Sequence, residues 1–198
     1  MTSPNQLSPL LTALADLFAT ENRPGGDENA RALRACAALA TDLPRTGPGP
    51  LAAHLHTALS GDPHPISPLV RQAAPWLVWT YSELGGRIRS DIARGMMQVE
   101  LVGPDGMFPD RNVRAGLWVQ SPNLAYTTRH HAAEETFFIL GGHAIWQAGD
   151  APEHRQGVGA QIHHASMVAH ADCTQNAPLL AAWRWSGAVS IEQYTFKG

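Results

Sequence analysis

Residues 126–142 read YTTRHHAAEETFFILGG and contain two adjacent histidines, two adjacent glutamates and a closing pair of glycines. A second stretch, HHASMVAH at residues 163–170, adds three more histidines. Imidazole nitrogens and carboxylate oxygens together suit borderline divalent metals such as zinc, iron, nickel or manganese, and three such ligands leave coordination positions open for a substrate. The two stretches therefore predict a metal site, and the chain around them indicates a small β-barrel.

The barrel is indicated by the texture of the chain from Met96 onward, where short apolar runs are broken by Gly, Pro and Asp. Such runs are typical of short strands joined by tight turns, and eight of them imply a sandwich or barrel. The fold class expected is mainly β. The predicted strands are residues 98–102, 115–119, 136–140, 144–147, 158–162, 167–171, 180–185 and 190–196.

The first third of the chain has a different pattern, with apolar residues at steps of three and four that predict amphipathic helices. We expect helices over residues 7–18, 27–41 and 51–59, followed by a proline-punctuated stretch and an aromatic segment at 76–81 that stays unassigned. We therefore expect two parts. Residues 1–95 form an α-helical portion that packs on the barrel, and residues 96–198 form the barrel itself.

The amino-acid composition limits the kinds of molecule that the protein is expected to bind. The net charge is −3, with 14 Lys and Arg residues and no basic cluster, so we expect neither nucleic acid nor a membrane as partner. Cys36 and Cys173 are far apart and in no Cys-x-x-Cys pair, which indicates free thiols. The chain shows no signal peptide and no long apolar run, so we expect a cytoplasmic protein. A homodimer is compatible with these features, but the residues do not fix the oligomeric state.

Two strand registers are possible for the candidate metal ligands in residues 130–135. On one strand, alternate side chains share a face, so His131 and Glu135 would point one way while His130 and Glu134 point the other. Each set pairs one imidazole with one carboxylate. Local spacing does not choose between them, and His130 is kept as the alternate ligand.

A third ligand is expected from the second histidine cluster, and His170 is the strongest candidate. It lies in an apolar run, where a buried imidazole requires a partner. His163 and His164 precede a predicted turn. We expect them either to be exposed or to contact a metal-binding residue without binding the metal themselves. His143 and His154 are expected at the surface.

These residues resemble the two signature motifs of the cupin superfamily, His-x-His-x3,4-Glu-x6-Gly and a later Gly and His. His131-x3-Glu135-x6-Gly142 matches the first motif, and Gly159-x10-His170 matches the second. Within cupins, the sequence is similar to the short bacterial dimethylsulfoniopropionate lyases. The similarity is carried by the segments LVGPDGMFPD, HHAAEE, IHHASMVAHA and LLAAWRWSG. The resemblance implies a single cupin barrel, a jelly roll, and selects His131, Glu135 and His170 as the metal ligands.

The sequence departs from the family pattern at two positions. Arg129 stands where the first histidine of the His-x-His pair belongs, and Phe137 stands where the family commonly has tyrosine. Arg129 carries only donors and cannot bind a cation, so it is either a surface charge or a clamp for a substrate carboxylate. The loss of the phenol at Phe137 leaves Tyr126 as the expected catalytic base.

The resemblance implies a metal-dependent carbon–sulfur lyase that cleaves dimethylsulfoniopropionate to dimethyl sulfide and acrylate by β-elimination. A sulfonium substrate calls for an aromatic wall, which Trp118, Phe137, Trp183 or the 76–81 segment would supply. The alternative is a metal-binding cupin that binds another small carboxylate, or acts on it, without lyase activity. Arg129 and Phe137 favour this second hypothesis.

Overall fold

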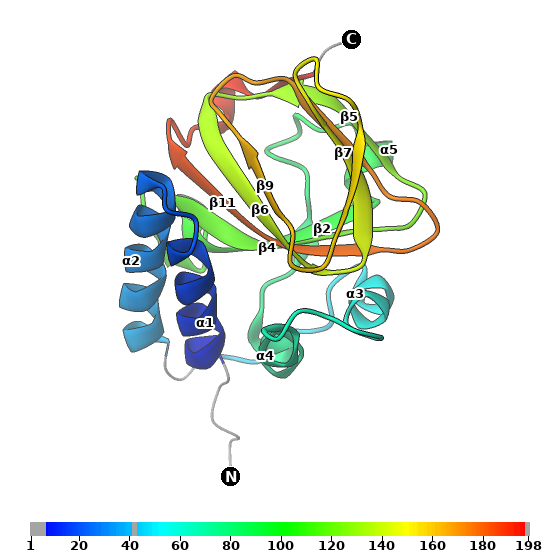
Figure 1. The fold of residues 1–198 in the computed structure, drawn as a ribbon. Coiled ribbons are helices and arrows are strands. Elements are labelled where there is room, and N and C mark those ends of the chain that lie inside the picture. The colour runs from blue at the N-terminus through cyan, green and yellow to red at the C-terminus, as the bar shows by residue number, and fades with distance from the viewer. Residues whose placement is uncertain (1–6, 41–42, 197–198) are drawn as a thin grey trace.

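The structure is a computed structural model that describes residues 7–40 and 43–196, and it consists of two facing β-sheets with most of its helices on one side (Figure 1). The expected mainly β fold with an α-helical N-terminal portion is confirmed. The helices are α1 (Leu7–Ala19), α2 (Pro24–Leu39), α3 (Ala52–Ala58), α4 (Ser67–Ala73) and the short α5 (Ser90–Ala93), with 3-10 turns η1 (Ala74–Trp76) and η2 (Ile191–Gln193).

The larger sheet has the strand order β1-β2-β4-β11-β6-β9, with β3 added beside β2. All its pairings are antiparallel except that of β2 with β3. Its strands are β1 (Thr80–Tyr81), β2 (Met96–Gly103), β3 (Phe108–Pro109), β4 (Arg114–Gln120), β6 (Ala133–Gly141), β9 (Gln161–His164) and β11 (Leu179–Gly187).

The smaller sheet is antiparallel throughout, with the order β12-β5-β10-β7-β8. Its strands are β5 (Ala125–His130), β7 (His143–Ala148), β8 (His154–Gly157), β10 (His170–Cys173) and β12 (Thr195–Phe196). The chain passes from one sheet to the other between β5 and β6, a link of only two residues. This crossing brings side chains of both sheets to the same end of the barrel.

The two faces of the larger sheet belong to two separate cores, which follows from strand alternation. Phe138 points outward and packs against Phe18 of α1, with ring centroids 5.8 Å apart. Phe137, its neighbour, points inward and packs against Trp146 of the smaller sheet. Helices α1 to α4 therefore cover the outer face (Figure 1). The inner face is left to an aromatic core between the sheets, to which α5 adds Ile92 and Ala93.

A buried ion pair joins the helical layer to the barrel. Arg184 of β11 is fully buried and donates to the carboxylate of Glu21, which follows α1. Its guanidinium also reaches Ser186 and the half-exposed Glu134. Gly25 in α2 allows this approach, because a Cβ there would lie 2.2 Å from Oγ of Ser186.

Several predicted element bounds are corrected by the structure. The expected strand 158–162 is displaced to β9, and the expected strand 167–171 begins only at His170, because Met167 has a φ of 63° in a turn. Residues 190–196 form η2 before the short β12. β5 and β8 were not predicted, since their residues are mostly polar. The expected end of the second helix at residue 41 lies outside the described residues.

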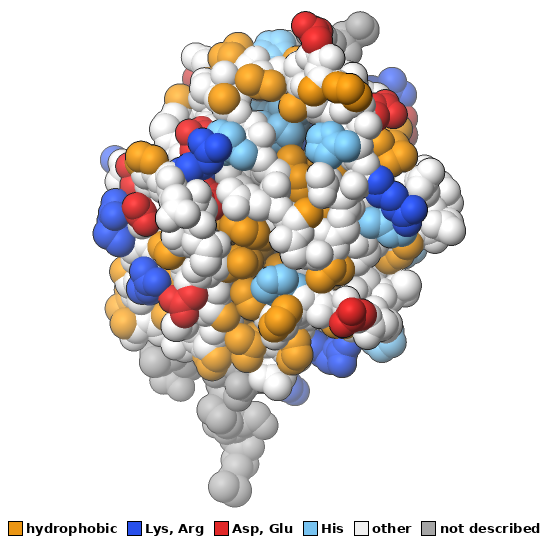
Figure 2. All heavy atoms as spheres, in the orientation of Figure 1, with side chains coloured by type: hydrophobic (Ala, Val, Ile, Leu, Met, Phe, Trp, Pro, Cys, Tyr) orange, Lys and Arg blue, Asp and Glu red, His pale blue; other side chains and the backbone are white. Residues whose placement is uncertain are grey.

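Two further features bear on the predictions from composition. Cys36 and Cys173 both carry free thiols. Among the helices of residues 7–40 and 43–196, none combines the length and apolar character needed to cross a bilayer. On the face shown in Figure 2, lysine and arginine side chains lie scattered among acidic ones and form no single patch.

Candidate metal centre

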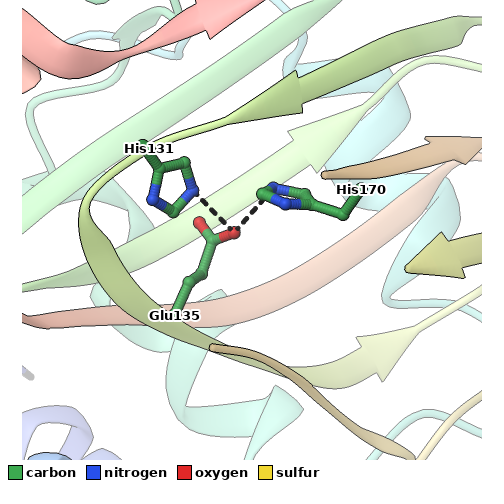
Figure 3. Close-up of side chains that lie close together, drawn as sticks. All are labelled: His131, Glu135 and His170. Carbon is green, nitrogen blue, oxygen red and sulfur yellow. Dashed lines mark hydrogen bonds and ion pairs between the residues drawn. The ribbon is translucent and has the colours of Figure 1, made fainter. Parts of the chain in front are cut away.

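Three side chains from both sheets converge at one end of the inner cavity (Figure 3). His131 lies in the crossing between β5 and β6, Glu135 lies in β6 and His170 begins β10. One ligand atom from each lies within 4.8 Å of the others, and all three residues are buried. Two imidazoles and one carboxylate at this spacing can surround a divalent ion and leave positions open for a substrate.

Both imidazoles are oriented by the backbone. Nδ1 of His131 lies 3.0 Å from the carbonyl oxygen of Ala133, and Nδ1 of His170 lies 2.9 Å from that of Val168. When a ring uses Nδ1 for this hydrogen bond, Nε2 is the atom that is available to a metal. The two Nε2 atoms face Glu135 at 3.4 and 3.3 Å, and Nε2 of His170 has no hydrogen-bond partner there. A buried imidazole nitrogen that has no hydrogen-bond partner and lies next to a carboxylate fits a ligand to an ion.

The carboxylate of Glu135 is also oriented so that it can bind a metal ion. Its Oε1 accepts a hydrogen bond of 2.6 Å from the indole Nε1 of Trp185, which leaves Oε2 to face the two imidazoles. Burial raises the pKa of Glu135, but His131 and His170 outweigh burial and hold that pKa well below its usual range. The group is therefore a carboxylate at neutral pH, as a metal ligand requires.

The alternate set does not converge. His130 pairs with Thr195 at the edge of the smaller sheet, and Glu134 turns to the outer face, where it meets Arg184 at 2.8 Å. The prediction that His131 and Glu135 share one strand was wrong, since the chain changes sheets between β5 and β6. The two side chains meet because the crossing folds His131 over the start of β6.

An aromatic cavity lies beside the three donors. Its walls include Trp118, Phe137 and Trp183, which sequence reasoning named, and Trp185. Nε1 of Trp183 is buried and has no hydrogen-bond partner. Trp183 and Trp185 lie two residues apart on β11, and both line the cavity. Of the 76–81 segment, Trp79 packs in the helix-facing core and Tyr81 is exposed, so neither lines this cavity.

Tyr126 lines the same cavity and is hydrogen bonded through its hydroxyl to that of Tyr194. Burial raises the pKa of Tyr126 above the reach of ordinary pH, although Arg129 and the hydrogen bond to Tyr194 act to lower it. Tyr194 was missed by sequence reasoning. It comes from the C-terminal segment, more than fifty residues after the metal motif, and no local spacing links it to the site.

Arg129 is buried, which excludes the interpretation as a surface charge. Its Nη2 forms an ion pair of 2.7 Å with Asp172, and its guanidinium carbon lies 3.7 Å from the centre of the Tyr126 ring. Asp172 was also missed. A buried arginine needs a charged partner, and that need is the one signal that could have pointed to it.

His164 is buried, which agrees with the second of the two alternatives expected for it, a contact with a metal-ligand candidate. Its ring stacks on that of His170 with centroids 4.1 Å apart and an angle of 10°. Burial lowers the pKa of His164 to about 3, so the ring is neutral. Of the other histidines, His154 is exposed, while His143 and His163 are half-buried.

Comparison with known proteins decides the family. The family model of dimethylsulfoniopropionate (DMSP) lyases matches residues 27–181. The chain belongs to the DMSP lyase family. One relative, the DMSP lyase DddQ of Ruegeria pomeroyi, is 30% identical over 109 residues, and the match spans 55% of this chain and 54% of the relative. The chain thus matches about half the length of that DMSP lyase.

Solved structures of DMSP lyases share the fold. The crystal structure of DddQ from Ruegeria pomeroyi superposes with a TM-score of 0.69 at 24% identity, covering 97% of this chain and 96% of that one. A chain from the crystal structures of the DMSP lyases RdDddP and RnDddQII gives a TM-score of 0.65 at 22% identity, covering 96% and 100%. The likeness therefore extends over the helical portion as well as the barrel.

Proposed function

We propose that this chain is a metal-dependent lyase that cleaves DMSP to dimethyl sulfide and acrylate by β-elimination. The observation that carries the proposal is the convergence of His131, Glu135 and His170 beside an aromatic cavity, in a chain of the DMSP lyase family. These three residues would hold a zinc, iron, nickel or manganese ion. When bound, such an ion supplies a Lewis acid that polarises the substrate carboxylate.

The cavity walls suit the cationic end of the substrate. The rings of Trp118 and Phe137 lie 5.5 Å apart, and Trp183 faces the same space. Aromatic faces attract a sulfonium as they attract an ammonium, through the negative charge of the ring face. The unpaired indole N–H of Trp183 is a donor that a substrate carboxylate could satisfy.

Tyr126 is the residue that would accept the proton. In the elimination, a C–H bond next to the carboxylate breaks and its proton goes to the Tyr126 oxygen. The electron pair forms the carbon–carbon double bond, and the C–S bond breaks with its pair leaving on sulfur. Because burial raises the pKa of Tyr126, this role depends on positive charge from Arg129 and from a bound ion.

The test is turnover by metal-loaded protein. Purified protein is incubated with DMSP, and dimethyl sulfide is measured in the headspace against the variant His170→Ala. We expect dimethyl sulfide and acrylate in equal amounts from the native chain and a loss of at least about 100-fold in the variant. No product above the variant would reject lyase activity on DMSP.

A second function is favoured by Phe137, which places no hydroxyl at its own position in the cavity wall, and by the raised pKa of Tyr126. In that case the chain binds another small carboxylate at the same ion and does not cleave DMSP. Thermal unfolding with a panel of small carboxylates separates the two functions, because a ligand that binds without reacting raises the melting temperature and yields no product.

A further inference from the structure

We propose that Tyr194 is a positioning residue that donates a hydrogen bond to the oxygen of Tyr126 and holds that oxygen toward the cavity. The inference rests on the proposed function, because it concerns how Tyr126 accepts a proton. It concerns a residue of the C-terminal segment that no spacing motif contains.

The fold fixes Tyr194 firmly in place. Its chain neighbours Thr195 and Phe196 form β12, which pairs with His130 and Arg129 of β5. Its ring stacks on His131 at 5.4 Å with an angle of 16° and on Trp185 at 6.2 Å with an angle of 20°. Tyr194 is 5% exposed, so the hydroxyl has little access to water.

The direction of the hydrogen bond follows from the chemistry. A Tyr126 that takes the substrate proton must enter the step as a phenolate, which has no proton to donate. The bond between the two hydroxyls must then run from Tyr194 to Tyr126. A donor aimed at a charged oxygen in a buried site stabilises that charge more strongly than it would in water.

Arg129 assists from the other side. Its guanidinium lies over the face of the Tyr126 ring and is kept there by Asp172. Tyr126 is thus held between a cation on its ring face and a phenol at its oxygen. Since Phe137 contributes no hydroxyl, Tyr126 and Tyr194 are the only phenols among the side chains that line this cavity in the described chain.

The chain offers a matched control, because its third tyrosine, Tyr81, lies exposed in β1. The variants Tyr194→Phe, Tyr126→Phe and Tyr81→Phe, each metal-loaded, are compared for dimethyl sulfide release across pH. We expect Tyr194→Phe to lower kcat by about 10- to 100-fold with KM little changed. The pH at which kcat/KM reaches half its maximum should rise by about one unit. The double variant should be no slower than Tyr126→Phe.

A pH profile for Tyr194→Phe that coincides with that of Tyr81→Phe would overturn the proposal. A loss that is equal at every pH would overturn it too, since Tyr194 would then serve packing alone.

A second measurement does not need turnover and so separates this proposal from the lyase activity. Protein labelled with carbon-13 at the tyrosine Cζ gives one signal for each of the three tyrosines, assigned from the three variants. We expect Tyr194→Phe to move the Tyr126 signal, Tyr126→Phe to move the Tyr194 signal, and Tyr81→Phe to move neither. Unmoved signals reject the hydrogen bond. Moved signals without any dimethyl sulfide from the native chain reject the lyase activity and retain the pair.

Discussion

At the scale of single residues, Arg129 shows how the cavity accommodates a buried charge. A buried guanidinium is costly unless a carboxylate faces it, and Asp172 does so from the neighbouring strand β10. The arginine therefore does not leave an uncompensated charge beside the three donors. It also adds a cation close to the Tyr126 ring.

The three candidate metal ligands, His131, Glu135 and His170 (the metal set), lead to a prediction about how much metal the protein binds. Replacing Glu135 by Gln removes a charged donor, so we expect metal affinity to fall by at least about 100-fold. Its neighbour Glu134 faces the other side of β6, and Glu134→Gln is the matched control that should keep the ion. Elemental analysis after dialysis measures both. Equal metal content in the two variants would contradict the assignment.

Phe137 gives a second prediction, because it lines the cavity where a phenol could act. The variant Phe137→Tyr supplies a second group able to move a proton, and we expect kcat for dimethyl sulfide release to rise about tenfold or more. The control is Phe138→Tyr, which places its hydroxyl against Phe18 in the helix-facing core. That control should lose stability and leave kcat unchanged. A native-like kcat for Phe137→Tyr would show that the phenol adds nothing.

At this scale the donor types could be named from the sequence, but local spacing left His130 and Glu134 open as an alternative to His131 and Glu135. The cupin resemblance chose between the two sets. Asp172 and Tyr194 could not be recognised in the same way. Each one acts through a partner on another strand, and the pairing of β5 with β10 and β12 is set by the whole barrel. Local spacing carries no information about such contacts.

At the scale of secondary-structure elements, the apolar strands were predictable and the polar ones were not. β6 and β11 are buried on both faces and have long apolar runs, whereas β5 reads AYTTRH. A strand at this position is recognised through its partners, β10 and β12, rather than through its own alternation. The same omission led to His131 and Glu135 being placed on one strand.

The contact of α2 with β11 yields a prediction at this scale. A methyl group at Gly25 would overlap Oγ of Ser186 and Nη1 of Arg184, so Gly25→Ala must push α2 away from the sheet. We expect a loss of about 1–3 kcal/mol in the free energy of unfolding. Gly47→Ala is the control, because its added Cβ would meet no atom within 4 Å. Denaturant unfolding that gives the same value for both would contradict this packing.

At the scale of the whole molecule, the helices and the barrel are tied together by Arg184 and Glu21. Both side chains are fully buried, so removal of one leaves the other charge without its main partner. We expect Glu21→Ala to cost about 3 kcal/mol or more in the free energy of unfolding. Asp16→Ala breaks the exposed pair with Arg34 and should cost less than about 1 kcal/mol. Similar melting temperatures for the two variants would argue against a structural role for the buried pair.

The metal set also acts at this scale, since Glu135 belongs to the larger sheet and His170 to the smaller one. An ion held by both would link the sheets, and removing it with a chelator should lower the melting temperature. Bound metal at 100 times its dissociation constant is worth about 2.7 kcal/mol. The variant His170→Ala should show no such difference between chelated and metal-supplemented samples. A native chain that melts at the same temperature in both would contradict binding.

The side chain of Asn29 in α2 donates to the carbonyl oxygen of Trp185, and the indole of that tryptophan donates to Glu135. One residue thus separates the outer helices from the carboxylate in the metal set. We therefore expect a change in the position of α2 to alter the metal affinity of the site through these two hydrogen bonds, even where α2 does not contact the cavity. Spectra of a bound cobalt probe should therefore change on heating before the sheets come apart.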